Sequence, residues 1–214
     1  MEWKDFEAVI PAVMSMPERA DSVRELLKEL GRQCPGIKVH IMPQWYEETP
    51  NWRDVFITIS RSLQNVTSPW VLYFEDDAQL APDFGERALP IINNVDDYCG
   101  AVAFFSSRCR DLEQFRDGIS LYEPELPFIF TQGMAIRKEV VEAWSNNMVE
   151  WWDKAKKKYQ KKAPDMALGH ACYQAGYKIL VHLPSLVQHR QIPSAYRHTY
   201  HPYSVTFGKK SKSQ

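Results

Sequence analysis

The sequence predicts an α/β fold, with helices flanking a mainly parallel sheet. Two observations carry this prediction. Over about the first 75 residues, buried-type apolar runs alternate with amphipathic segments in the order strand, helix, strand, helix, strand, as expected of a parallel sheet wrapped by helices. A hydrophobic content of 44% with 25% charged residues is ordinary for a globular protein. We therefore expect the 214 residues to form one domain.

The elements of the first half are marked by apolar periodicity and by breakers at their ends. An apolar run at 6–14 predicts a buried strand, and the helix after it is expected to begin near Ser15, with Pro17 in its first turn. Gly31 is expected to end this helix. The next elements are expected at residues 36–43 (strand), 51–64 (helix) and 68–77 (strand).

The second half continues less regularly. An acidic and aromatic stretch at 110–130 is expected to be irregular, and Gly176 is expected to end a helix that starts at Pro164. The other expected elements are 83–94 (helix), 98–107 (strand), 131–144 (strand end passing into a helix) and 178–183 (strand). We expect the domain to span 1–207 and the basic tail 208–214 to be disordered.

Charge and cysteine content bear on the binding partners and the cellular compartment that we expect. A net charge of −1 shows no global preference for polyanions, so anion binding is expected to be local. The four cysteines, Cys34, Cys99, Cys109 and Cys172, are scattered without a C-x-x-C pair, which favours reduced thiols. No stretch has the length and apolarity of a signal peptide or a membrane span, and we expect a cytoplasmic protein.

Three acidic residues, Glu75, Asp76 and Asp77, directly follow the apolar strand "WVLYF". Carboxylates are ligands suited to Mg²⁺ or Mn²⁺, and ligands of parallel sheets bind at the carboxyl ends of the strands. A solvated turn is the alternative, and it is the usual interpretation of an isolated acidic pair. Three in a row at this edge of the sheet favour a metal site.

Four segments in this order resemble the GT-A glycosyltransferases, in particular the small family 2-like enzymes of bacteria and their phages. The resemblance covers roughly residues 6–189, and the segments are "VIPAVMSMPERADSVRELLKEL", "PWVLYFEDDAQLAPDF", "PDMALGHACYQAGYKI" and "PSLVQH". It implies a GT-A fold, a nucleotide-sugar half at about 1–84 and an acceptor half at about 85–207. The implied donor is a UDP-sugar or a related nucleotide sugar, and the implied reaction is the transfer of its sugar to a hydroxyl group, with inversion.

The resemblance also implies how the acidic residues act. Asp77 matches the direct ligand of a divalent metal, Mn²⁺ or Mg²⁺, in the family's Asp-x-Asp motif, while Glu75 and Asp76 match contacts to ribose, sugar or metal-bound water. Glu75 departs from the family's pattern, which has Asp there. His189 in "PSLVQH" matches a second metal ligand. The alternative is that His189 is a surface histidine, since other histidines lie nearby: His182, His198 and His201.

Five residues near the first two helices are candidates for contacts to the nucleotide. Pro11, Ser15 and Arg19 belong to the first strand-to-helix region, where helix amides attract phosphate. Gln44 follows the second strand, and Arg53 begins the second helix, where its planar guanidinium suits a diphosphate. For both arginines the alternative is a solvent-facing position on a helix.

Asp165 matches the general base of the inverting enzymes, where a carboxylate takes the acceptor's proton. An acidic residue that only favours the helix dipole is the alternative. Gly133 and Met134 in "TQGMAIR" resemble the segment that lines the donor sugar and the acceptor, where a glycine allows close approach of the backbone.

A lysine-rich run precedes Asp165 and bears on the acceptor. Its residues of interest are Trp151, Trp152, Lys156, Lys157 and Lys158. Lysines interleaved with aromatic residues suit an anionic acceptor such as a hydroxymethylated pyrimidine in phage DNA, or an anionic lipid or surface polysaccharide. A solvated helix face is the alternative.

Two other functions remain open at this stage. A nucleotidyltransferase would share the strand order and the acidic residues, but it is expected to carry a glycine-rich loop after the first strand. The segment "PAVMSMPER" has no glycine there. A catalytically silent nucleotide-binding protein is the other alternative.

Overall fold

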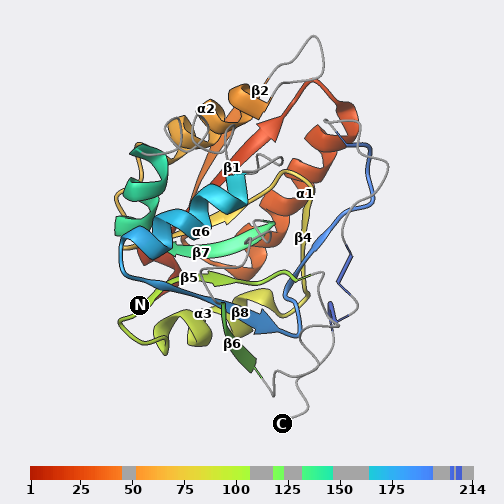
Figure 1. Cartoon of the computed structure of the whole chain (residues 1–214). Helices are drawn as coiled ribbons and strands as arrows, with labels where there is room; N and C mark the ends of the chain where they lie inside the picture. Colours follow the sequence, from red (N-terminus) through yellow and green to blue (C-terminus); the bar gives the residue numbers. More distant parts are fainter. Residues whose placement is uncertain are drawn as a thin grey trace.

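The structure is a computed structural model that describes residues 1–44, 52–106, 118–122, 132–146, 164–194, 203–204 and 206–208. Within these ranges, only the backbone is described for residues 52–56, 118–122 and 164–166. Figure 1 shows the chain and its labelled elements. In the described part of the chain, no helix is long and apolar enough to cross a membrane.

A seven-stranded sheet forms the centre of the fold, in the order β2-β1-β3-β7-β5-β8-β6. Its strands are β1 (Glu7–Val13), β2 (Lys38–Gln44), β3 (Trp70–Phe74), β5 (Cys99–Ala103), β6 (Gly118–Tyr122), β7 (Gly133–Arg137) and β8 (Lys178–Leu183). The pairs β1/β2, β1/β3 and β5/β8 are parallel, while β7 is antiparallel to both β3 and β5, and β6 is antiparallel to β8. β1, β2, β3, β5 and β8 therefore run in one direction, which confirms the predicted mainly parallel sheet.

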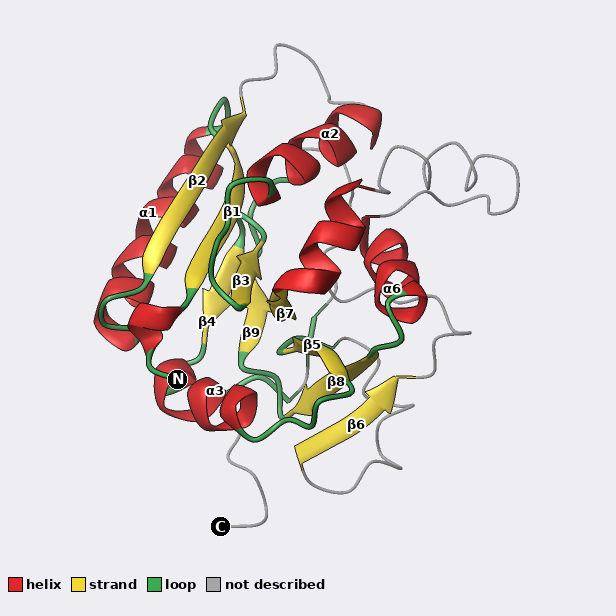
Figure 2. Cartoon of the chain, turned by 90° about the vertical axis from the view of Figure 1, so that its left-hand side faces the viewer, coloured by secondary structure: helices red, strands yellow, loops and turns green. Residues whose placement is uncertain are grey.

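Helices cover both faces of this sheet. Figure 2 shows α1 and α3 on one side and α2 and α6 on the other. Their bounds are α1 (Pro17–Gln33), α2 (Trp52–Leu63), α3 (Phe84–Asn93) and α6 (Pro164–Gln174), with a 3₁₀ turn η1 (Trp3–Asp5) and a further helix at 138–146. The layered α/β prediction from the alternating pattern is confirmed.

Helix α1 shows how the sequence sets an element, and where the prediction of its end was wrong. Val23, Leu26 and Leu30 are buried at helical spacing against the sheet. The helix does not stop at Gly31 but runs to Gln33, since Cys34, four residues after Leu30, continues the buried stripe and its backbone N–H donates to the Leu30 carbonyl. The turn that follows is taken by Gly36, whose φ of +86° favours glycine.

Two further strands, β4 (Ala78–Leu80) and β9 (Val187–His189), form a separate antiparallel sheet that the sequence did not predict. Each has three residues, too few for a periodicity to show. This small sheet joins the chain after β3 to the chain after β8, and it is central to the candidate site below.

The cysteines agree with the predicted reduced thiols wherever the structure describes them. Cys34, Cys99 and Cys172 are buried and free, while Cys109 lies outside the described residues. Burial raises the pKa of the Cys34 thiol to about 12, so this thiol stays protonated. Of the predicted tail, Gly208 closes a turn at 206–208, and residues 209–214 lie outside the described ranges.

Candidate metal and donor site

The β4/β9 sheet brings Asp77 and His189 together although they are far apart in the sequence. Ala78 and His189 are partners in the antiparallel ladder. The ladder extends by one bond, because the backbone N–H of Arg190 donates to the carbonyl of Asp77 at 2.7 Å. As a result, Nδ1 of His189 lies 3.3 Å from Oδ1 of Asp77, and both side chains are buried.

Glu75 joins this pair from the end of β3. Its backbone N–H donates to the carbonyl of Gln132 at 3.3 Å, and its Oε2 accepts from Nε2 of Gln132 at 3.2 Å. Glu75, Asp77 and His189 each present a ligand atom, and the three atoms lie within 4.8 Å of one another. We call these three residues the carboxylate–histidine cluster.

The carboxylate–histidine cluster fits a divalent cation. An ion bound at about 2.1 Å holds adjacent octahedral ligands about 3 Å apart and opposite ligands about 4.2 Å apart. Spacings of up to 4.8 Å are close to this size, and sharing one ion requires at most a small inward movement of the side chains. Two carboxylate oxygens with one imidazole nitrogen suit Mn²⁺ better than Mg²⁺, which prefers oxygen ligands alone.

The protonation of His189 is linked to the carboxylates of the cluster. Burial opposes its charged form, but hydrogen bonding and the charge of Asp77, with help from Glu75, raise the pKa of His189 above its ordinary value. A metal requires the neutral imidazole, so metal binding is expected to release a proton. The ring of Phe105 meets the His189 ring edge-on, with centroids 5.3 Å apart, and limits its rotation.

Asp76 points away from the cluster into the protein. Its Oδ2 accepts from the backbone N–H of Val13 at 2.7 Å, and its Oδ1 pairs with Nη1 of Arg19. Arg19 is 5% exposed and Asp76 is 4% exposed. Burial raises the pKa of Asp76 and nearby Asp77 adds to the rise, whereas Arg19 and the Val13 amide oppose it.

Arg19 also connects to the cluster itself. Its Nη2 lies 3.3 Å from Oδ2 of Asp77, and its Nε donates to the carbonyl of Pro193 at 3.2 Å. The two oxygens of Asp77 thus have separate neighbours, Arg19 on one side and His189 on the other. Both Arg19 and Asp76, which were expected to contact the donor, are placed here against each other and not towards solvent.

The other donor candidates that the structure describes lie along the first two strands and the turn after β1. Pro11 is half-buried within β1 and is paired with Met42 of β2. Ser15 is exposed in the turn between β1 and α1. Gln44 ends β2, and its Oε1 accepts from the Thr58 hydroxyl at 2.7 Å. All three belong to the end of the sheet where β1 and β2 finish.

Gly133 and Met134 lie in β7 and are buried. A Cβ on Gly133 would come within 2.6 Å of Cγ2 of Val187 in β9. The absence of a side chain therefore serves the packing of β9 on β7, two residues from His189. Gly133 is also the ladder partner of Phe74, which places β7 beside the acidic residues.

Several predicted residues have side chains outside the described part of the structure. Arg53 is the second residue of α2 and Asp165 the second residue of α6, and for both only the backbone is described. The acceptor candidates of the lysine-rich run lie wholly outside the described residues: Trp151, Trp152, Lys156, Lys157 and Lys158. Their expected roles stay predictions.

Sequence reasoning missed Gln132, the residue that holds Glu75. It is the neighbour of Gly133 in a segment that the sequence did single out. Only the antiparallel register of β7 on β3, with Gly133 opposite Phe74, puts Gln132 opposite Glu75. That register is a long-range property, and no local pattern in the sequence shows it.

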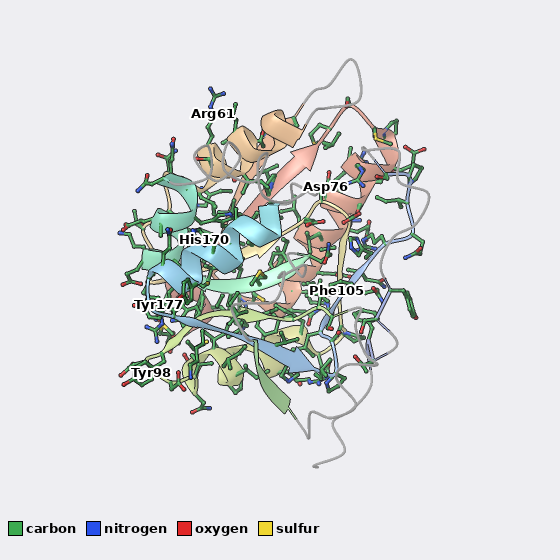
Figure 3. All side chains as sticks on the ribbon, in the orientation of Figure 1. Arg61, Asp76, Tyr98, Phe105, His170 and Tyr177 are labelled. Atoms are coloured by element: carbon green, nitrogen blue, oxygen red, sulfur yellow. The ribbon has the colours of Figure 1, made fainter. Side chains whose placement is uncertain are left out.

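Figure 3 places the site at one end of the sheet. Asp76 and Phe105 follow β3 and β5 and lie on the right of the view, whereas Tyr98 and Tyr177 precede β5 and β8 and lie on the left. The site therefore occupies the carboxyl ends of the parallel strands, where α/β sheets bind ligands.

Comparison with solved structures supports the fold, whereas no family model and no curated protein sequence matches the chain. Among solved structures, it resembles a glycosyltransferase involved in the glycosylation of the major capsid of PBCV-1, with a TM-score of 0.54 and 12% identity over 89% of this chain and 94% of that one.

Two further structures are similar to the chain. One is TarS of S. aureus in complex with UDP-GlcNAc, with a TM-score of 0.51 and 11% identity over 94% of this chain and 62% of that one. The other is the mannosyltransferase PcManGT of Pyrobaculum calidifontis in complex with GDP-Man and Mn²⁺, with a TM-score of 0.50 and 15% identity over 83% of this chain and 56% of that one. The chain thus spans less than two thirds of these two proteins. The GT-A fold predicted from the sequence is confirmed.

Proposed function

We propose that the protein is a divalent-metal-dependent glycosyltransferase that moves a sugar from a nucleotide-sugar donor to a hydroxyl acceptor. The observation that carries the proposal is the carboxylate–histidine cluster of Glu75, Asp77 and His189 at the carboxyl edge of a GT-A sheet. The PcManGT structure was obtained with GDP-Man and Mn²⁺, and TarS with UDP-GlcNAc, which supports a nucleotide-sugar donor.

The chain's own residues divide the work at this site. Asp77, Glu75 and His189 would hold the ion, Gln132 orients Glu75, and Arg19 fixes one oxygen of Asp77. When bound, the ion supplies charge neutralisation of a diphosphate leaving group. A rigid sheet end suits this task, since it keeps like charges close without letting them move apart.

Asp165 is our candidate for the general base of an inverting transfer, because it opens α6 in the segment that resembles the inverting enzymes. The acceptor that we favour is anionic, on the strength of the lysine-rich run before α6. Hydroxymethylpyrimidine DNA of a phage is one such acceptor, and a surface polysaccharide or an anionic lipid is another. Asp165→Asn should keep donor binding and lose transfer, and near-normal turnover would exclude it as the base.

The test of the proposal is a screen of UDP-sugars and GDP-sugars for Mn²⁺-dependent binding and hydrolysis, followed by transfer to modified DNA and to glycans. Asp77→Asn is expected to weaken Mn²⁺ binding on the order of a hundredfold or more. Asp83→Asn is the matched control, because Asp83 lies at the N-cap position of α3 without a capping side-chain hydrogen bond and its pair with Arg87 is long, at 3.5 Å.

Three results would contradict the proposal in different ways. If Asp77→Asn binds Mn²⁺ as tightly as Asp83→Asn, the cluster is not the metal site. If nucleotide sugars bind but no donor is hydrolysed or transferred, the chain is a nucleotide-binding protein. If a nucleoside triphosphate is consumed with release of pyrophosphate, it is a nucleotidyltransferase.

A further inference from the structure

We infer that Gln188 positions the metal site and does so by joining it to the C-terminal segment at Ser204. The inference rests on the proposed function, because it takes His189 as a metal ligand. Gln188 precedes His189 in β9 and is 2% exposed. Ser204, which lies outside every helix and strand, is 0% exposed.

The side chain of Gln188 bonds to two backbone segments at once. Its Oε1 accepts from the backbone N–H of His189 at 3.0 Å and from that of Ser204 at 3.3 Å. Its Nε2 donates to the carbonyl of Ser204 at 3.1 Å. The amide thus pairs with Ser204 as a neighbouring strand would, and the same oxygen fixes the backbone of the proposed ligand.

A second path connects Ser204 to the imidazole ring. The Ser204 hydroxyl donates to Oγ of Ser185 at 2.8 Å, and that oxygen also accepts from the backbone N–H of Ser106 at 3.1 Å. Ser106 follows Phe105, whose ring packs edge-on against the ring of His189. The C-terminal segment therefore reaches both the backbone and the ring of His189.

The segment is anchored by more than these bonds. Thr206 accepts from the backbone N–H of Ser185 at 3.0 Å, and Phe207 packs partly buried against the core. Buried polar groups that lose their partners are costly. Removing the Gln188 amide would take away the acceptor of the Ser204 N–H and leave the Ser204 carbonyl with the backbone N–H of Phe207, at 3.3 Å, so the segment should loosen there.

Loosening of the backbone around Gln188 should lower the affinity of the site for the metal. Residues that orient metal ligands typically change metal affinity about 10–100-fold when they are mutated. Coupling of this kind is reciprocal, so an ion that binds better when the C-terminal segment is docked must also stabilise the docked segment. The affinity for the metal and the docking of the C-terminal segment therefore both report the same coupling through Gln188.

The first experiment titrates Mn²⁺ into the full chain. Gln188→Ala is expected to bind it about 10–100-fold more weakly than wild type. The affinity of Ser204→Ala for Mn²⁺ should fall by less than about tenfold, because the backbone groups of residue 204 can still bond to Gln188. Gln79→Ala is the matched control, since Gln79 is the ladder partner of Gln188 on β4, and its affinity should stay within about threefold of wild type.

The second experiment is carried out on the wild-type chain, with Asp77→Asn as its control. Amide hydrogen exchange at residues 203–208 of the wild-type chain should slow when Mn²⁺ is added, and Asp77→Asn should abolish this slowing. If the wild-type chain binds no Mn²⁺, the proposed function fails. If it binds Mn²⁺ while Gln188→Ala binds equally well and exchange at 203–208 is unchanged, the proposed metal site stands and this inference is overturned.

Discussion

Arg19→Met tests whether the buried ion pair under the site stabilises the protein. The substitution removes the guanidinium that contacts Asp76 and Asp77 and, among the residues that the structure describes, leaves the Val13 amide as the hydrogen-bond partner of Asp76. Breaking a buried pair by removing one partner costs about 3–5 kcal/mol. We expect the low end, about 3 kcal/mol, because Asp76 can take up a proton. For a domain of this size that is a fall in Tm of roughly 6–12 °C.

The sign of the pH dependence distinguishes this mechanism from a simple loss of packing. In Arg19→Met the pKa of Asp76 should lie further above its unfolded value of about 3.9 than in wild type. Between the two values the unfolded state is ionised and the folded state is not, so stability falls as pH rises. The loss relative to wild type should therefore be larger at pH 8 than at pH 5.

Calorimetry at both pH values provides the assay, with Arg24→Met as control. Arg24 lies on the same helix and pairs with Asp21 at 2.7 Å, but both side chains are exposed. An exposed ion pair contributes little to the free energy of unfolding, so the control substitution should shift Tm by roughly 2 °C or less. Equal shifts in the two variants, or a shift in Arg19→Met that is the same at both pH values, would refute the reasoning.

Two further predictions concern neighbouring elements. Gly133→Ala should cost about 1–3 kcal/mol in urea unfolding and weaken Mn²⁺ binding, because its Cβ would press on Val187 of β9; unchanged binding would mean that β9 tolerates the shift. Burial and the charge of Arg87 lower the pKa of His182 to about 4, so its neutral form stabilises the fold above pH 6.5. Roughly 3 kcal/mol should be lost as pH falls from 6.5 to 4, and His182→Gln should reduce this loss in urea titrations at several pH values.

Much of the fold could be predicted because the signals that set it are local. The stripe of Val23, Leu26 and Leu30 marks α1, and the apolar run at 70–74 marks β3. Since parallel strands end at one edge of their sheet, the position of Asp77 followed from the strand order alone. The pairing of β4 with β9 could not be predicted in this way, because three-residue strands have no periodicity and their register is set by contacts distant in sequence.

The burial of Arg19 has a signal in the sequence, which is its place in the helical repeat of α1. Arg19 lies four residues before Val23 and seven before Leu26, so it falls on the apolar stripe of α1. An arginine on a buried stripe requires an acidic partner in the core. Asp76 supplies it, and that pairing turns the middle carboxylate of the triplet inward while its two neighbours face the cluster.

The charges of the site also imply an order of binding. Three adjacent carboxylates repel one another and any incoming phosphate. Arg19 pairs with both Asp76 and Asp77 and supplies one positive charge for three carboxylates, which leaves an excess of negative charge at Glu75 and Asp77 beside His189. A divalent ion matches that pair, whereas without the ion the site would repel a diphosphate. We therefore expect the metal to bind before the donor, and UDP or GDP to bind weakly in EDTA and tightly in Mn²⁺.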